Sequence, residues 1–499
     1  MRTGLLLLLS LAVVSFSSTD SWQSKYLEVN SDGTIRYNAD AQGNTIPDFS
    51  KVGYRTGNVP IPDVPVVQTI SPGPHAEGAI QQAIDALAKK APGKNGFRGA
   101  ILLKKGTYPI QNNIKINASG IVLRGEGNDT RLIAEGTGRR ALIDVSGTGA
   151  IEEIKGTRTA VTAAYVPVGA HALQVAAAAA FKPGDAIILQ WQALPKWIED
   201  LKMNQIVERP GTKQWQAAEY DFKFQRTITK IEGNTLFIDN PIVMAIDAPY
   251  NTARVYKYRF EGRISQVGVE NLSCVSAYTS DTAEDHSWDA VAFNKIENGW
   301  VRNVSATYFA YSCVNLGSLS RNISVLNCTS SDLKSIITGG RRYSFGNNGQ
   351  MNLVMNCTAR DGRHDYVTGA RVCGPNVFYN CTATRTHADI GPHHRWAMGT
   401  LYDNITTDGE INIQDRGNWG SGHGWAGVNQ VVWHCTAKKA TVQNPWASGK
   451  NYCIGLQGQK STGRLAGRPD GEWEGQNKKG LEPASLYTAQ LKARGMVPR

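Results

Sequence analysis

The densest group of chemically active residues in this 499-residue chain lies between positions 363 and 425. It consists of three segments: R-H-D-Y at 363–366, H-A-D-I-G-P-H-H-R-W at 387–396 and Q-D-R-G-N-W-G-S-G-H-G-W at 414–425. Six of the nine histidines fall between His364 and His434, and this clustering beside Tyr and Arg favours a functional site over scattered structural histidines. Histidine exchanges protons near neutral pH, and arginine binds carboxylates or sulfates bidentately. The cluster therefore predicts proton transfer beside a bound anion.

Elimination from a uronic acid is a reaction that needs such a set of side chains. A cation must neutralise the C6 carboxylate so that the C5 proton becomes acidic, a base must remove that proton, and an acid must protonate the leaving glycosidic oxygen. Arginine can supply the first function, histidine the second and tyrosine the third, given suitable pKa values. The catalytic candidates are Arg371 and Arg395 as carboxylate clamps, His364 or His394 as the base, and Tyr366 as the acid.

A second group of side chains is predicted to bind the substrate. Tryptophans can stack on sugar faces, and further arginines and histidines can bind acidic groups. These candidates are Arg342, Arg363, His387, Trp396, Arg416, Trp419, His423 and Trp425.

A repeat in the second half of the chain predicts how these residues are positioned. A similar short motif, such as V-L-N-C-T or V-M-N-C-T, recurs at intervals of 24 to 32 residues. It is centred on Asn271, Asn303, Asn327, Asn356, Asn380, Asn404 and His434. A β-rich unit with such a period is typical of a solenoid, in which each unit buries its apolar face against the next. One unit has room for three short strands, so the repeat predicts an all-β, single-stranded parallel β-helix. The six asparagines are predicted to form a stacked, hydrogen-bonded ladder.

Counting from the repeat positions aligns residues on neighbouring rungs. Fifteen positions beyond three of the asparagines stand Arg342, Arg371 and Arg395, which predicts a column of positive charge facing a groove. Nine positions beyond two of them stand Asp365 and Asp389, a stacked carboxylate pair and the only metal-site candidate. Calcium takes about 6–8 oxygen ligands, so one pair is thin, and the expectation is either no cofactor or Ca²⁺. The competing interpretation is that these Arg and Asp residues form salt bridges between rungs.

The N-terminal part of the chain resembles a known family. The segment A-I-Q-Q-A-I-D-A-L forms a short amphipathic pattern with Ile80, Ile84 and Leu87 on one face. With the following K-K-G-T-Y-P-I and G-I-V-L-R-G-E-G-N-D-T-R-L, it resembles the opening of the pectate-lyase-like superfamily over residues 77–145. The resemblance implies a right-handed β-helix whose N-terminal end is capped by a helix. It also implies activity on polysaccharides, by lyases that often use calcium with a Lys or Arg base.

Two alternatives to a lyase stay open at this point. A glycoside hydrolase on the same fold is the first, because the G-H-G tripeptide at 422–424 is similar to one in the polygalacturonase family. That family also needs an adjacent Asp-Asp pair, which this chain lacks, although Asp365 with Asp389, or Asp403 with Asp415, could supply two carboxylates. A non-catalytic glycan-binding solenoid is the second; it would use the Arg and Trp residues but would not require the His–Tyr cluster.

Composition and charge predict an exported protein with an acidic glycan as its partner. With 19% charged residues and 51 glycines, the chain suits a β-rich, turn-rich secreted protein. Residues 1–18 have the Arg, the short apolar run and the small residues of a secretory signal peptide. In an exported protein, the net charge of +11 fits an acidic polysaccharide better than nucleic acid. No later segment suggests a membrane span, and we expect a monomer.

The chain divides into six expected parts. They are the signal peptide 1–18, an extended arm 19–75, the cap and first rungs 76–149, an inserted β-rich segment 150–260, the main rungs 261–458 and a C-terminal tail 459–499. Four of the eight cysteines, Cys328, Cys357, Cys381 and Cys435, directly follow repeat positions, which predicts stacked, buried thiols. The sequons at Asn117, Asn128 and Asn322 are candidate glycosylation sites.

Overall fold

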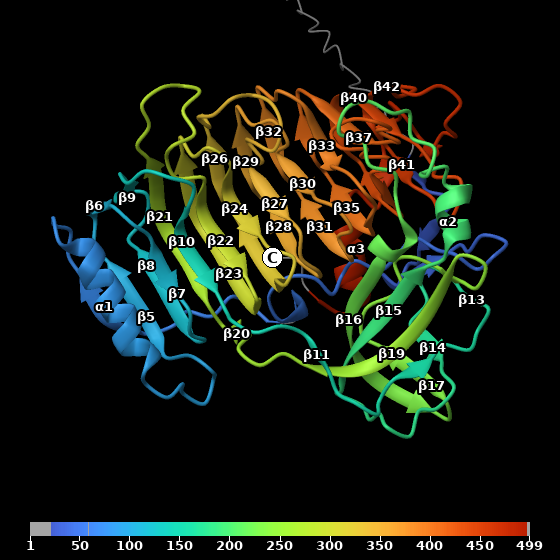
Figure 1. Ribbon diagram of the computed structural model, residues 1–499, viewed down its shortest axis with the longest axis horizontal. Helices are drawn as coiled ribbons and strands as arrows, with labels where there is room; N and C mark the ends of the chain where they lie inside the picture. Colours follow the sequence, from blue (N-terminus) through green and yellow to red (C-terminus); the bar gives the residue numbers. More distant parts are fainter. Residues whose placement is uncertain (1–20, 58, 497–499) are drawn as a thin grey trace, which may run out of the picture.

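The computed structural model describes residues 21–57 and 59–496, and the expected signal peptide lies outside them. Most of these residues form a parallel β-helix, the fold that the repeat predicted (Figure 1). Each rung contributes strands to three faces, and each strand pairs in parallel with its equivalent in the next rung.

Strand pairing defines the three faces. The first face contains β4 (Val66–Ile70), β5 (Gly99–Leu103), β8 (Ile121–Gly125), β20 (Ile264–Ser265), β21 (Gly268–Ser276), β23 (Ile296–Thr307), β25 (Arg321–Leu326), β28 (Leu353–Met355), β31 (Asn376–Tyr379), β35 (Thr400–Asp403), β39 (Val431–Trp433), β41 (Tyr452–Ile454) and β43 (Glu472–Glu474). The second contains β6 (Gly106–Ile110), β9 (Thr130–Ala134), the far halves of β21 and β23, β26 (Thr329–Ser331), β29 (Thr358–Arg360), β32 (Thr382–Thr384), β36 (Thr406–Thr407), β40 (Thr436–Val442) and β42 (Gln457–Lys460). The third contains β7 (Ile114–Ile116), β10 (Ala141–Ser146), β22 (Asp289–Asn294), β24 (Ser312–Leu316), β27 (Phe345–Asn347), β30 (Tyr366–Thr368), β33 (Asp389–Pro392), β37 (Glu410–Ile413) and the end of β40.

The seven repeat positions occupy the corner between the first and second faces. All seven have positive φ, between 50° and 58°, a conformation that asparagine adopts more readily than most residues. The side-chain amides form the expected ladder in part: Asn303 donates to Asn271 at 2.8 Å, Asn327 to Asn303 at 3.2 Å and Asn380 to Asn356 at 2.7 Å, whereas Asn404 donates to the carbonyl of Ala484 instead. The repeated asparagine is therefore explained by a sharp turn and by a polar stack along the axis.

The interior of the β-helix is a continuous apolar core. All eight cysteines are buried and unpaired by disulfides, which confirms the stacked-thiol prediction for Cys328, Cys357, Cys381 and Cys435. Helix α1 (Ala76–Ala88) buries Ile80, Ile84 and Leu87 against this core, as the amphipathic pattern predicted. It covers the N-terminal end of the solenoid (Figure 1).

Residues between β10 and β20 form a second sheet. Its seven antiparallel strands are β11 (Glu152–Glu153), β12 (Thr159–Ala160), β14 (Ala172–Gln174), β15 (Ala186–Ala193), β16 (Asp221–Glu232), β17 (Thr235–Ile238) and β19 (Asn251–Arg259). The short pair β13 (Tyr165–Val166) and β18 (Ile246–Asp247), helix α2 (Pro195–Asp200) and the 3-10 turn η2 (Ala217–Glu219) accompany it. An aromatic cluster that includes Trp191, Trp197 and Trp215 packs this inserted unit against the β-helix. The inserted unit lies beside the third face (Figure 1).

The first and last described segments lie together on the flank of the β-helix. Strand β1 (Trp22–Gln23) pairs with β44 (Leu481–Glu482), and β2 (Leu27–Val29) pairs with β3 (Ile35–Tyr37). Helix α3 (Leu486–Ala493) packs against β35 and the N-terminal arm, which includes the 3-10 turn η1 (Tyr54–Gly57). The remaining pair is β34 (Ala397–Met398) with β38 (Gly427–Val428). Among the described residues, none of the helices has the length and apolar character that crossing a membrane requires.

Candidate functional site

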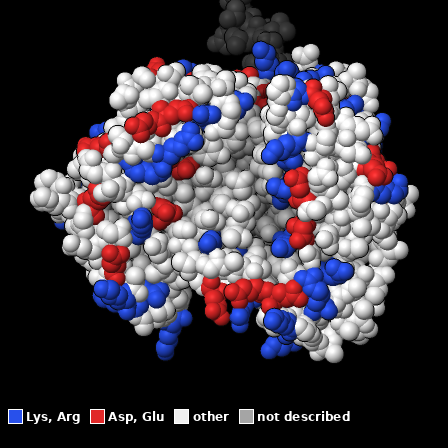
Figure 2. Space-filling view, in the orientation of Figure 1, with Lys and Arg blue, Asp and Glu red and all other residues white. Residues whose placement is uncertain are grey.

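A pocket of about 720 Å³ opens on the third face, beside the inserted sheet. Figure 2 shows this face hollowed near its centre, with few charged atoms on the floor of the hollow and both basic and acidic side chains around it. The loops before β27, β30 and β33 and the segments after β33 and β37 supply its lining. The lining residues are Gly339, Gly340, Tyr343, Arg363, His364, Ala388, Asp389, His393, His394, Arg416, Trp419, Gly420 and His423.

Rung stacking brings these segments together. The backbone N–H groups of Arg363 and His364 donate to the carbonyl of Arg342 on the preceding rung. The backbone N–H of Arg395 donates in the same way to the carbonyl of His423 on the following rung. Residues about one rung apart in sequence are thereby held within one backbone hydrogen bond of each other.

His364 has a defined tautomer. Its Nδ1 lies 2.8 Å from the backbone carbonyl oxygen of Asp389, and because a carbonyl only accepts, Nδ1 carries the proton. Its Nε2 is buried and has no hydrogen-bond partner among the described residues. Burial lowers the pKa of His364 to about 4, against the opposing attraction of Asp389. This imidazole is therefore neutral at pH 7, with a bare, buried Nε2.

Tyr343 and three further histidines form the centre of the pocket. The Tyr343 hydroxyl lies 3.0 Å from His393 Nε2, and His393 Nδ1 lies 2.9 Å from His394 Nδ1. The ring of His423 lies 4.9 Å, centre to centre, from those of His393 and His394. Burial, with the neighbouring charges, lowers the pKa of His394 to about 4 and of His423 to about 3; it also lowers the pKa of His393 and raises that of Tyr343. At neutral pH the whole centre is uncharged.

Three charged side chains, Arg363, Asp389 and Arg416, line the edge of the pocket. Arg416 is buried and forms an ion pair with Asp389. Burial alone would raise the pKa of Asp389, but Arg416 and His364 outweigh it and hold the pKa below its usual value. Arg363 donates one N–H to the carbonyl of Gly339 and is only half-buried. The surroundings of the neutral histidines are therefore net positive, which suits an anionic ligand.

Seven predicted site residues line this pocket: His364, His394, Arg363, Arg416, Trp419, His423 and Asp389. The two central residues that sequence reasoning missed are Tyr343 and His393. His393 stands in the H-H pair whose second member was chosen. The sequence could have indicated Tyr343, because R-Y-S-F at 342–345 aligns with R-H-D-Y at 363–366 and places Tyr343 opposite His364. The strands pair in that register, with Phe345 opposite Tyr366.

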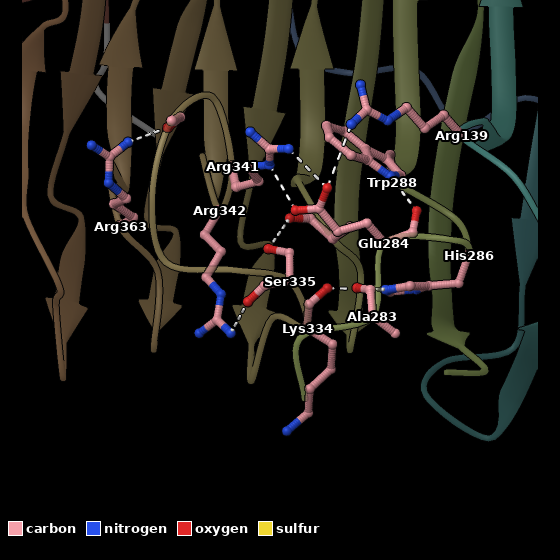
Figure 3. A network of polar contacts seen from close by, with 12 residues as sticks. Arg139, Ala283, Glu284, His286, Trp288, Lys334, Ser335, Arg341, Arg342 and Arg363 are labelled. Atoms are coloured by element: carbon pink, nitrogen blue, oxygen red, sulfur yellow. Dashed lines mark hydrogen bonds and ion pairs between the residues drawn. The ribbon is translucent and has the colours of Figure 1, made fainter. Parts of the chain in front are cut away.

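The predicted column of three arginines does not form as expected. Arg371 does stack on Arg395 through a backbone hydrogen bond, but Arg342 stacks below Arg363 instead. The rung that contains Arg342 carries a longer loop, so counting fifteen positions reaches a different place in the turn. Arg342 donates to the carbonyl of Ser335 at 2.6 Å and points away from Arg363 (Figure 3).

Arg371 and Arg395 contact the inserted unit rather than the pocket. Arg371 donates to the carbonyl of Glu219 at 2.8 Å, and Arg395 forms an ion pair with the carboxylate of Glu219 at 3.7 Å. Neither lines the pocket, although the charges of both lower the pKa of His394. Both arginines therefore lie outside the pocket lining and act on His394 only through their charge.

Four further candidates are placed elsewhere. Tyr366 is inside the β-helix, where its hydroxyl donates to the carbonyls of Cys357 and Thr382, so it is removed from the acid role. Trp396 and Trp425 are fully buried between the β-helix and the inserted sheet and have no face free for a sugar. His387 is exposed at a corner, 2.8 Å from a carboxylate oxygen of Asp361, outside the pocket lining.

The two aspartates considered for calcium occupy equivalent strand positions but have different partners. Asp365 is buried and accepts from Ser344 Oγ at 2.5 Å, and burial raises the pKa of Asp365 to about 7. Asp389 is occupied by Arg416. Within residues 21–57 and 59–496, no group of three or more His, Cys, Asp or Glu side chains is arranged to hold a metal ion. The two carboxylates therefore have different partners, and the expectation of either no cofactor or Ca²⁺ stays a prediction.

Comparisons with known proteins assign this chain to no family. No family model matches the chain, and no curated protein matches it. Solved structures do match, among them the tailspike protein gp49 from Pseudomonas phage LKA1, with 14% identity, a TM-score of 0.45, and 77% of this chain and 62% of that chain covered. Another is the alginate lyase from Paenibacillus sp. str. FPU-7, with 9% identity, a TM-score of 0.31, and 78% and 99% covered. The catalytic domain of GH87 alpha-1,3-glucanase in complex with nigerose has 9% identity and a TM-score of 0.38, with 84% and 66% covered.

The chain thus spans less than two thirds of the length of the tailspike and of the glucanase domain. The β-helix is shown by the strand pairing of this chain itself. Membership of the pectate-lyase-like superfamily stays a prediction.

Proposed function

We propose that this protein is a polysaccharide lyase that cleaves an acidic, uronic-acid-containing polysaccharide by β-elimination in the histidine-lined pocket. The observation that carries the proposal is the uncharged His–Tyr centre surrounded by arginines. A neutral histidine can accept a proton, a protonated tyrosine can donate one, and the arginines favour a carboxylate beside them. With the export signal expected at residues 1–18, the polymer would be met outside the cell.

The anionic group of the substrate is assigned to Arg363 and Arg416. Arg363 keeps N–H groups that are not used by Gly339 and is half-buried at the pocket edge. Arg416 is fixed by Asp389, so its position is set before substrate arrives. A carboxylate bound between them would lose much of its negative charge, and the C5 proton next to it would become more acidic. Trp419, half-buried on the same edge, offers a ring face to a sugar.

The proton-transfer roles are assigned to His394 and Tyr343. His394 is neutral and half-buried, and its Nε2 makes no hydrogen bond to the described residues, so it can reach a ligand. Tyr343 replaces Tyr366 as the acid because its hydroxyl lines the pocket. His364 is set further back, since its free Nε2 is buried against the rings of Tyr343 and His393.

Hydrolysis by two carboxylates has less support. Asp389 is the one carboxylate among the pocket-lining residues described, and it is paired with Arg416. Asp403 accepts hydrogen bonds from Ser485 and from the start of α3, and Asp415 pairs with Arg468. A hydrolase would need a second free carboxylate about 5–9.5 Å away from the first. Elimination needs none.

The deciding experiment is incubation of the purified full-length protein with pectate, alginate, glucuronan and glycosaminoglycans. Elimination creates a C4–C5 double bond conjugated to the carboxylate, so ultraviolet absorbance should rise with one of these polymers. New reducing ends without that absorbance would show hydrolysis instead. Binding with neither signal would show a non-catalytic glycan-binding protein.

A further inference from the structure

We infer that Tyr343, His393 and His394 form a proton relay that connects the base to the acid, so that a proton taken from the substrate at His394 is returned to it by Tyr343. This inference rests on the proposed function and deepens it. It gives His393, which contacts both partners, a role of its own.

The relay is built on two short contacts. His393 Nε2 lies 3.0 Å from the Tyr343 hydroxyl, and His393 Nδ1 lies 2.9 Å from His394 Nδ1. Both distances are those of ordinary hydrogen bonds. His393 thus has both ring nitrogens engaged, each with a member of the proposed acid–base pair. His364, by contrast, donates its Nδ1–H to the backbone carbonyl of Asp389. A carbonyl oxygen does not give up a proton in return, so His364 cannot pass a proton through its ring.

Neutral rings allow only two consistent arrangements of protons, because each N–N or O–N contact holds one hydrogen. In the first, His394 Nδ1–H donates to His393 Nδ1, His393 Nε2–H donates to the Tyr343 oxygen, and His394 Nε2 is a bare base. In the second, the Tyr343 hydroxyl donates to His393 Nε2, His393 Nδ1–H donates to His394 Nδ1, and His394 Nε2 carries a proton. The two differ by a shift of every proton by one position.

That shift is the proton balance of the elimination. His394 Nε2 takes the C5 proton, and its Nδ1 proton passes to His393 Nδ1. The Nε2 proton of His393 passes to the Tyr343 oxygen, and the original hydroxyl proton of Tyr343 passes to the glycosidic oxygen. The electron pair of the C5–H bond forms the C4–C5 double bond, and the C4–O bond breaks with its electrons on the protonated leaving oxygen. The protein ends in the second arrangement with no change of charge, and exchange with water restores the first.

The surroundings explain why such a relay is useful here. A lasting imidazolium would lie among the Arg395, Arg416 and Arg371 charges that, together with burial, lower the pKa of His394. Passing the proton onward avoids that charged state. His364 holds the rings of Tyr343 and His393 in position. It contacts both edge-on, with ring centres 4.9 Å and 4.7 Å apart.

The first test observes the chain of hydrogen bonds directly. In the full-length protein labelled with [¹⁵N]histidine, a scalar coupling across the N–H···N contact between His393 and His394 is expected, with both rings neutral at pH 7. His393→Gln assigns the signals. Absence of the coupling, or a charged ring, overturns the relay whatever the protein catalyses. The coupling in a wild-type protein that acts on none of the polymers would support the hydrogen-bonded chain but overturn its use in elimination.

The second test asks whether both nitrogens of His393 are needed. His393→Gly should lower turnover by about 10²-fold or more, as for loss of a proton-transfer group, with little change in KM. Imidazole should restore part of that turnover, whereas 1-methylimidazole, which fills the same space but has only one nitrogen able to exchange a proton, should not. His387→Gly, at an exposed corner, is the matched control that neither compound affects. Equal rescue by both compounds, or wild-type turnover in His393→Gly, would assign His393 a structural role only.

Discussion

Removing one hydroxyl from the pocket, in the Tyr343→Phe variant, isolates the assigned acid. The Tyr343 hydroxyl contacts His393 Nε2 at 3.0 Å, and the ring itself stacks on Tyr311 with centres 5.0 Å apart. Phenylalanine keeps the ring and loses only the hydrogen bond, whose net contribution to folding is about 1 kcal/mol. The fold and the arginine contacts should therefore survive, and KM should change little.

Turnover should fall steeply in the same variant. General acid catalysis contributes about 10²–10⁴-fold to rate, which corresponds to about 3–5 kcal/mol of barrier height. The measurement is kcat and KM from the absorbance of the unsaturated product, on the polymer that the wild type cleaves, with a thermal melt of each protein. The loss should appear in kcat and in kcat/KM equally, because the hydroxyl acts on the leaving oxygen only in the transition state.

Tyr366→Phe is the matched control. It deletes the same hydroxyl one rung away, where that group donates to two buried carbonyls at 2.8 and 2.7 Å. Leaving buried acceptors unpaired should cost about 1–3 kcal/mol of stability, while kcat stays near the wild-type value. The opposite pattern, with Tyr343→Phe active and Tyr366→Phe well folded but inactive, would refute the assignment of the acid.

Four further outcomes follow from the same geometry. Because burial and nearby arginines lower the pKa of His394 to about 4, the acid limb of kcat/KM should lie near pH 4 instead of pH 6.5, and a limb near 6.5 would contradict the assigned base. The lowered histidine pKa values also mean that the unfolded chain binds more protons, so stability should fall as pH drops from about 6.5 through about 4. Asp389→Asn should lower the free energy of unfolding by about 3–5 kcal/mol in chemical denaturation, since it leaves buried Arg416 unpaired; a neutral effect would show that the pair is dispensable. EDTA should not change the elimination rate, and loss of activity that Ca²⁺ restores would reveal a metal requirement.

The fold could be predicted from the sequence because its determinants are local and repeated. Each asparagine of the ladder marks a turn with positive φ, and the ladder is a contact between identical residues about one rung apart. The same regularity predicted the buried cysteines, and the cap helix was predicted from its own local apolar pattern. Residue spacing carries this information whenever the intervening loops have equal length.

The site was predictable only in part, because it depends on the unequal loops. The extra residues before β27 shift Arg342 out of the arginine column and bring Tyr343 into the pocket. Trp396 and Trp425 were misassigned for another reason: residues more than a hundred positions earlier in the chain cover them. Tyr366 was misassigned because it occupies the same inward-facing strand position as Phe345. The two rings stack inside the β-helix with centres 5.5 Å apart.

The electrostatics of the pocket favour an anion for a reason beyond attraction. In the empty site burial, and after it the arginine charges, lower the pKa of His394, which makes it a weak base. A uronate bound at Arg363 and Arg416 would cancel part of that positive field, so the pKa of the same histidine should rise when an anionic substrate binds. The base would then be strongest only in the complex with an acidic sugar, and a neutral glycan of the same shape would leave it weak. Discrimination for acidic polymers would thus act on the proton-transfer step as well as on binding, and the acid limb of kcat should lie at higher pH than that of kcat/KM.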